Sequence, residues 1–264
     1  MGLRIRTNVA SQAVRKTLTS ADRVAGDSYE KLASGKRITK SADDAAGLGI
    51  AKKMEAEVRG YRMAQRNANA GISLVQVAEG GLNEATNIMT RMRELSIQAA
   101  SDTVGEKERG YLNLEYEQLL QEADRITKTT TFSGKELLTG NSDTGTMDFH
   151  VGAYGGEDNK ISFNADQTDA TVENLGISGT NIATKEDASE NLSKIDDAID
   201  TVSGFRANFG SIQSRLQSTI SNLDTMSVNT EAARSRIEDV DVAEETAKLA
   251  STNVMKQAGI STLS

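Results

Sequence analysis

The chain has 264 residues, a formal net charge of −8, and no Cys, Pro or Trp. The acidic balance argues against a nucleic-acid partner, because phosphate binding needs clustered Lys and Arg. The absence of Cys excludes disulfides and thiolate metal sites, and the absence of Pro fits long uninterrupted helices, because Pro removes a helical hydrogen-bond donor.

The sequence gives no sign of membrane insertion or of a cleaved signal. It contains no apolar run of about 20 residues, the length that crosses a bilayer as a helix. Its first residues, Met1–Asn8, lack the apolar core of a signal peptide. Composition alone therefore predicts a cytoplasmic protein.

Residues 3–33 are the first predicted helix. Gly35 is a suitable stop for it, because Gly accepts the left-handed backbone of a helix C-terminus. The apolar stripe of this helix is Val14, Leu18, Ala21, Ala25 and Leu32.

A much longer helix is predicted from the capping box Ser41/Asp44 to about Ala100. From Asp43 to Ala99 it is about 85 Å long at 1.5 Å per residue. A helix of that length needs partner helices in this chain or in neighbouring copies. Its stripe is Ala68, Ile72, Val75, Ala78, Leu82, Ala85, Met89, Met92, Leu95 and Ala99.

A third helix is predicted from a second capping box, Thr103/Glu106, to about Thr129. Its apolar positions follow a heptad of alternating four- and three-residue steps. They are Leu112, Tyr116, Leu119, Ala123 and Ile126.

The hydrophobic period then changes to two. Alternation in 146–151 and 160–164, around a Gly-rich turn, predicts a β-hairpin at about 146–163. Phe149 and Phe163 belong to its apolar face, and Gly155 and Gly156 lie in the turn, where bulky replacements would be disruptive if the turn needs positive φ. Residues 164–183 are expected to be irregular or to form short strands.

The last long helix is predicted from a third capping box, Thr184/Asp187, and runs on, with a possible break, to Val254. The two halves of the chain then pack antiparallel. The predicted fold is mainly α, a long coiled-coil-like rod built from both termini with the small hairpin near its tip. The stripe is Leu192, Ile195, Ile199, Val202, Phe209, Ile212, Leu216, Ile220 and Leu223, continued by Val240, Ala243, Ala247, Ala250 and Val254.

Several sequence words at both ends resemble those of bacterial flagellins, and the resemblance is weakest between about residues 140 and 181. The words are Leu32-Ala-Ser-Gly-Lys-Arg-Ile, Ser41-Ala-Asp-Asp-Ala-Ala-Gly, Arg66-Asn-Ala-Asn-Ala-Gly-Ile-Ser, Arg91-Met-Arg-Glu-Leu, Asn208-Phe-Gly-Ser-Ile-Gln-Ser-Arg, Ala233-Arg-Ser-Arg-Ile-Glu-Asp and Gln257-Ala-Gly.

The resemblance implies a structural subunit that self-assembles into the flagellar filament, in a short form without outer domains. It implies an inner terminal domain of residues 1–44 and 238–264, and a rod domain of residues 45–237. Flagellins continue past the Gln257-Ala-Gly word, so we expect that this sequence is truncated or omits its last residues. The residues expected to assemble the filament core are Val14, Leu18, Ala21, Leu32, Ala247 and Val254.

The resemblance also implies a location and partners. Flagellins are secreted without a cleaved signal, through the channel of the flagellum, into an extracellular filament. The expected partners are other copies of the chain, an export chaperone, the export apparatus, hook-associated and cap proteins, and sister flagellins. A vertebrate Toll-like receptor recognises flagellins through a footprint that falls here on Arg91, Leu95 and Glu115.

No catalytic, cofactor or metal site is expected, and the chain is not expected to be an enzyme. His150 stands alone on the hairpin, and the adjacent carboxylates Asp43 and Asp44 more simply begin a helix. Two other classes remain as alternatives: a hook–filament junction protein of the same superfamily, and a coiled-coil signalling rod. The signalling rod predicts no β segment, so the alternation in 146–163 speaks against it.

Overall fold

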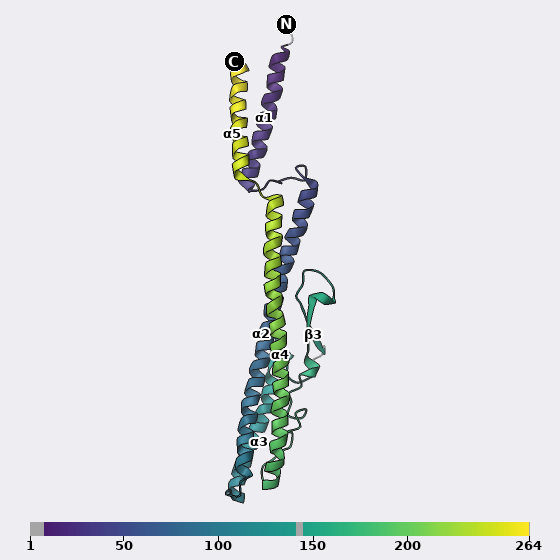
Figure 1. Cartoon of the computed structure of the whole chain (residues 1–264), viewed down its shortest axis with the longest axis vertical. Coiled ribbons are helices and arrows are strands. Elements are labelled where there is room, and N and C mark those ends of the chain that lie inside the picture. Colours follow the sequence, from purple (N-terminus) through teal and green to yellow (C-terminus); the bar gives the residue numbers. More distant parts are fainter. Residues whose placement is uncertain (1–7, 141–144, 264) are drawn as a thin grey trace. The chain divides into compact units, whose positions relative to one another are not determined.

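The computed structural model describes residues 8–140 and 145–263 (Figure 1). Five α-helices dominate them, with four short strands and two 3-10 turns in the segment between α3 and α4. The helices are α1 (Val9–Ser34), α2 (Ala45–Ala99), α3 (Glu106–Thr129), α4 (Lys185–Glu238) and α5 (Val242–Leu263). The strands are β1 (Thr131–Phe132), β2 (Lys135–Glu136), β3 (Thr146–His150) and β4 (Lys160–Asn164), and the 3-10 turns are η1 (Glu157–Asn159) and η2 (Ala165–Gln167).

The chain divides into two compact units. The terminal unit comprises Met1–Arg59 and Met226–Ser264, and the rod unit comprises Gly60–Thr225. Helices α2 and α4 each continue from one unit into the other. Both units therefore combine segments from the two halves of the sequence.

In the terminal unit, α1 packs antiparallel against α5. Three contacts show the direction: Gly259 lies near Leu18, Lys256 pairs with Asp22, and Glu245 bonds to Ser28. Higher numbers on one helix thus meet lower numbers on the other. Figure 1 shows the two helices side by side.

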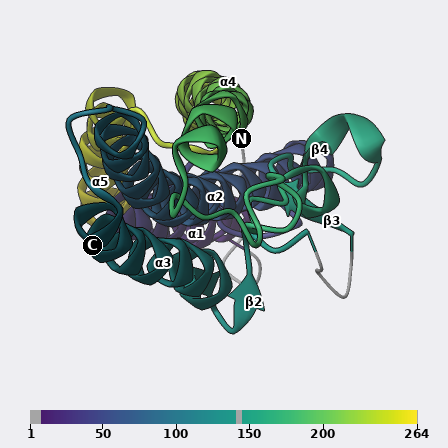
Figure 2. The same cartoon turned by 90° about the horizontal axis from the view of Figure 1, so that it is seen from below.

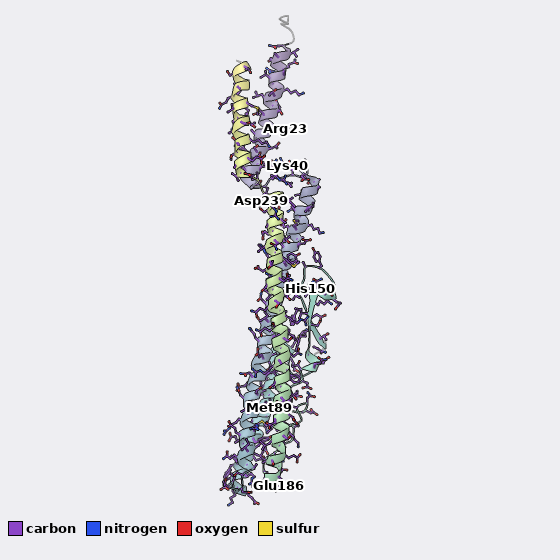
Figure 3. All side chains as sticks on the ribbon, viewed as in Figure 1. Arg23, Lys40, Met89, His150, Glu186 and Asp239 are labelled. Atoms are coloured by element: carbon purple, nitrogen blue, oxygen red, sulfur yellow. The ribbon has the colours of Figure 1, made fainter. Side chains whose placement is uncertain are left out.

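In the rod unit, α2 and α4 run antiparallel and α3 packs beside them. Arg93 pairs with Asp196 at one level, and Leu216 lies beside Gly71 at another. Most of the predicted stripe residues of the three helices lie in one core, which includes Met89 (labelled in Figure 3), whereas Leu223 packs in a smaller cluster with Tyr61 and Ala64. Figure 2 shows the three helices grouped, with the β3–β4 hairpin to one side.

Strands β3 and β4 form the predicted antiparallel hairpin, with Phe149 opposite Ile161 and Met147 opposite Phe163. It lies against α2, because two glycines of that helix, Gly60 and Gly71, let it approach. A Cβ at Gly71 would lie 3.2 Å from the Phe149 ring.

Two of the three predicted capping boxes are wrong. Asp44, not Ser41, caps α2, because its carboxylate accepts the N–H of Gly47 at 2.8 Å. Asp43 instead accepts backbone N–H groups of the preceding loop.

Thr103 does not cap α3, which begins after Gly105 without a side-chain cap. Its hydroxyl pairs with Ser101 inside the α2–α3 turn. Thr184 does begin α4, accepting the Asp187 N–H at 3.1 Å.

The helix ends agree with the sequence more closely. Gly35 ends α1 with φ of 70°, and the expected break separates α4 from α5 between Glu238 and Val242. The predicted fold, mainly α and antiparallel with a small hairpin, is confirmed.

Candidate functional site

The described residues contain no group of three or more side chains suited to holding a metal ion. His150 is exposed on β3 (Figure 3), and its backbone carbonyl accepts a hydrogen bond from Asn67. The surfaces of the helices therefore carry the candidate contacts.

The expected assembly residues of α1 lie on the face that meets α5. Ala21 and Ala25 are buried there, and Val14, Leu18 and Leu32 are half-buried. This stripe is small, so it buries little apolar area and stabilises the pair only modestly.

On α5 the expected stripe lies on the other side. Ala247 and Val254 are exposed, and Val254 retains 65% of its surface. The face that meets α1 is instead carried by Glu245, Thr252 and Lys256. Small apolar residues occur all around α5, so their spacing does not single out one face.

A buried polar contact joins α1 to α5. The Ser28 hydroxyl donates to the Glu245 carboxylate, and both residues are buried. This hydrogen bond and the nearby Lys248 ammonium lower the pKa of Glu245 below its ordinary value, against the opposing effect of burial.

A second set of contacts, which we call the clasp, joins the loop after α1 to the end of α4. Arg37 donates to the Ile237 carbonyl at 2.7 Å, and Lys36 pairs with the buried carboxylate of Glu238. Backbone hydrogen bonds run from Arg37 to Glu238 and from Val240 to Gly35. Lys40 and Asp239 mark this region in Figure 3.

The expected receptor residues separate into an exposed pair and a core residue. Arg91 binds Glu115 through its Nε and one Nη at 3.0 and 2.9 Å, and also contacts Glu94. Leu95 is only 1% exposed and packs in the rod core. Four residues advance an α-helix by about one full turn plus 40°. This offset is enough to place Arg91 at the surface and Leu95 in the core.

The hairpin residues also differ among themselves. Phe163 is buried and stacks at a tilt on Phe209, with ring centroids 5.2 Å apart. Phe149 is half-buried. Gly156 has φ of 126°, whereas Gly155 does not have positive φ, so the turn's need for positive φ falls on Gly156.

Sequence reasoning missed the polar groups that fix loops. Buried Arg109 donates to the carbonyls of Ala99 and Val104 at 2.8 and 3.0 Å, which holds the α2–α3 turn. Such contacts have no periodic signal. The one available hint was an Arg one turn after the helix start, beside a Gly.

Two family models match this chain. Residues 5–143 match the bacterial flagellin N-terminal helical region, and residues 192–264 match the bacterial flagellin C-terminal helical region. This chain belongs to the bacterial flagellin family. As a flagellin, it is a structural subunit of the bacterial flagellar filament, and the family is structural rather than enzymatic.

Curated flagellins match over most of their length. The chain is 42% identical to a flagellin of Halalkalibacterium halodurans over 87% of this chain and 83% of that protein. It is 35% identical to flagellin FlaB2 of Treponema pallidum over 98% of this chain and 94% of that protein.

Solved structures agree on the fold. Bacillus cereus flagellin is 28% identical with a TM-score of 0.53, over 64% of this chain and 94% of that structure. A putative flagellar hook-associated protein of Vibrio parahaemolyticus gives a TM-score of 0.61 at 13% identity, over 75% of this chain and 100% of that structure. The latter similarity concerns the fold alone.

Among residues 8–140 and 145–263, no helix combines the length and the apolar character needed to cross a bilayer.

Proposed function

We propose that residues 1–44 and 238–264 form the filament core, and that residues 45–237 form the rod domain that surrounds it. The observation that carries this proposal is the exposed apolar side of α5. Val254, Met255 and Ile260 each keep more than half of their surface exposed. Burying one such side chain against another copy contributes about 1.5–3 kcal/mol.

In this proposal α5 uses its two sides differently. One side of α5, which bonds to Ser28 and carries Lys256, holds α1. The other side, which carries Ala247 and Val254, packs against neighbouring copies. Val14, Leu18, Ala21 and Leu32 support assembly indirectly, by keeping α1 on α5.

The sequence alternatives are weaker. The β3–β4 hairpin argues against a coiled-coil signalling rod, which has no β segment at its tip. The hook-associated protein shares only a fold with this chain, at 13% identity. A shared fold does not by itself imply a shared function, so it does not favour a hook–filament junction role.

Location and other partners follow from family membership as part of the same proposal. The filament lies outside the cell, and the chain is secreted through the flagellar channel. It meets an export chaperone, the export apparatus, hook-associated and cap proteins and sister flagellins.

Recognition by a Toll-like receptor is proposed through Arg91 and Glu115, which are exposed on adjacent helices. Leu95 would support the pair from the core. A reporter-cell assay with monomer should give less signal for Arg91→Ala than for wild type. Equal signals would remove Arg91 from the footprint.

Seeded polymerisation tests the main function. The full chain should sediment as filaments, whereas a chain lacking residues 1–33 should stay monomeric. Val254→Asp should block polymerisation while leaving the monomer melting temperature unchanged, because the residue is exposed there.

Val228→Asp on α4, also exposed, is the matched control, since residue 228 lies outside the proposed core. Normal filaments from the truncated chain, or from Val254→Asp, would contradict the proposal. If the full chain formed only short oligomers that stop growing, instead of filaments, the result would favour the junction role.

A further inference from the structure

A groove in the rod unit is lined by an arginine, Arg206, that pairs with no acidic side chain among the described residues. It has a volume of about 300 Å³ and is lined by Gln76, Glu79, Gly80, Asn83 and Arg206, from α2 and α4. We call it the Arg206 groove. In the part of the chain that the structure describes, the buried Nε–H of Arg206 has no hydrogen-bond acceptor.

An arginine nitrogen buried without an acceptor costs free energy, which an incoming acceptor would recover. Glu79 lines the same groove but makes no ion pair with Arg206 within the described residues. The floor is open at Gly80, where an added Cβ would meet nothing within 4 Å. The groove can therefore admit a side chain from outside.

An acidic surface of the same unit has the complementary charge. Glu106 and Glu108 on α3 and Glu186 on α4 are exposed and pair with no basic side chain in the described residues. The Lys185–Asp102 ion pair, at 2.6 Å, holds the start of α4 to the turn that precedes α3. We call this surface the acidic end, where Glu186 is labelled in Figure 3.

We propose that the Arg206 groove receives a carboxylate from the acidic end of a second copy of the chain. The guanidinium fork suits a carboxylate, because two parallel N–H bonds can form. This inference rests on the proposed self-assembly, and it names a contact between rod units rather than between terminal helices. Isolated chains leave both surfaces open, and the polymer pairs them.

The test compares the critical concentration for seeded polymerisation with the melting temperature of the monomer. Arg206→Gln should raise the critical concentration about tenfold, equivalent to about 1.4 kcal/mol. Its monomer should melt at the same temperature or higher, because an unpaired buried donor is lost. Arg206→Lys should be intermediate, since it keeps the charge but not the fork.

Arg215→Gln is the matched control. Residue 215 is an exposed arginine on the same helix, and nine residues at 100° each place it on the opposite face from Arg206. Its critical concentration should stay within twofold of wild type. An equal rise for both variants would show an effect of net charge and overturn the proposal.

A charge exchange identifies the source of the carboxylate. Arg206→Glu should polymerise poorly, and adding Glu106→Lys and Glu108→Lys should restore polymerisation at least tenfold. No restoration would overturn the assignment to the acidic end. A lower monomer melting temperature for Arg206→Gln would assign Arg206 to the monomer fold instead.

These failures are distinguishable from failure of the proposed function. If wild-type chain does not extend seeds, self-assembly itself is wrong. If wild type extends them and Arg206→Gln does so equally well, only the groove contact is wrong.

Discussion

Tyr116 shows how one buried hydroxyl fastens a loop to the helical core. Its oxygen lies 2.7 Å from the Thr180 hydroxyl, which itself donates to the Ile177 carbonyl at 2.8 Å. Either hydroxyl of the Tyr116–Thr180 pair can be the donor. Burial raises the pKa of Tyr116 above its ordinary value, while the bond to Thr180 opposes that shift.

We predict that Tyr116→Phe lowers the free energy of unfolding by about 1 kcal/mol at neutral pH. Above pH 10, the free energy of unfolding should also decrease less steeply with pH in this variant than in wild type. The unfolded tyrosine ionises first as pH rises past its ordinary pKa, so the wild-type fold loses stability until the folded pKa is reached. Denaturant titrations at several pH values measure both effects.

Tyr111→Phe, on the same helix and 71% exposed, is the control and should change neither quantity. A Tyr116→Phe protein as pH-sensitive as wild type would contradict the prediction.

At this scale, periodicity identified buried positions well only where stripes were rich in large residues. The α2 stripe from Val75 to Met92 is buried as predicted. Spacing placed Leu95 in the buried stripe and left Arg91 outside it, but it could not find the contact face of α5, because that face depends on what lies opposite. The Arg206 groove was equally beyond reach, since it needs two helices to be placed together.

At the scale of elements, the α2–α3 turn depends on a buried arginine. The guanidinium of Arg109 takes the place of water for carbonyls at the end of α2 and in the turn. Helix ends leave such carbonyls without partners unless a side chain or solvent supplies one.

Arg109→Met should therefore cost about 2–3 kcal/mol of stability, because it leaves carbonyls without a donor. Hydrogen exchange should accelerate most in the last turn of α2. Lys107→Met, at an exposed position on the same helix, should change exchange little. Uniform acceleration across the rod unit would indicate a general packing defect instead.

The stability of the contact between α1 and α5 is expected to decrease at acid pH. The lowered pKa of Glu245 means that its stabilising effect is present above the ordinary pKa of 4.5 and is lost as pH falls below it. Ser28→Ala removes the largest cause of the shift. It should weaken the terminal unit at neutral pH and make its acid unfolding less steep.

Circular dichroism of the monomer between pH 7 and 3 would follow this change. Ser20→Ala, exposed on the same helix, serves as the control. An acid transition unaltered by Ser28→Ala would mean that Glu245 does not govern it.

At the scale of the whole molecule, the sequence predicted the number, order and direction of the helices, because their stripes are long. It did not show that the hairpin packs on Gly60 and Gly71 of α2, because such glycines look like weak points of a helix when read alone. It left open a break in the last helix without placing it, and it did not find the clasp beside that break.

Filament shape provides a test at this scale. Gly156→Val should alter the supercoil pitch, because φ of 126° is strained for any residue with a Cβ. Gly155→Val is the matched control, since that position is exposed and has no such backbone requirement. Dark-field microscopy of filaments measures pitch, and identical waveforms for both variants would rule out a role for this turn.

The pairing of Ser28 with Glu245 has a kinetic consequence. The two residues are 217 positions apart, and closing such a loop in a free chain costs about 5 kcal/mol of entropy. Folding of the rod unit removes most of that cost, because it packs Tyr61 against Leu223 and so brings the two outgoing segments together. The terminal helices are therefore expected to join last during folding and to part first during unfolding.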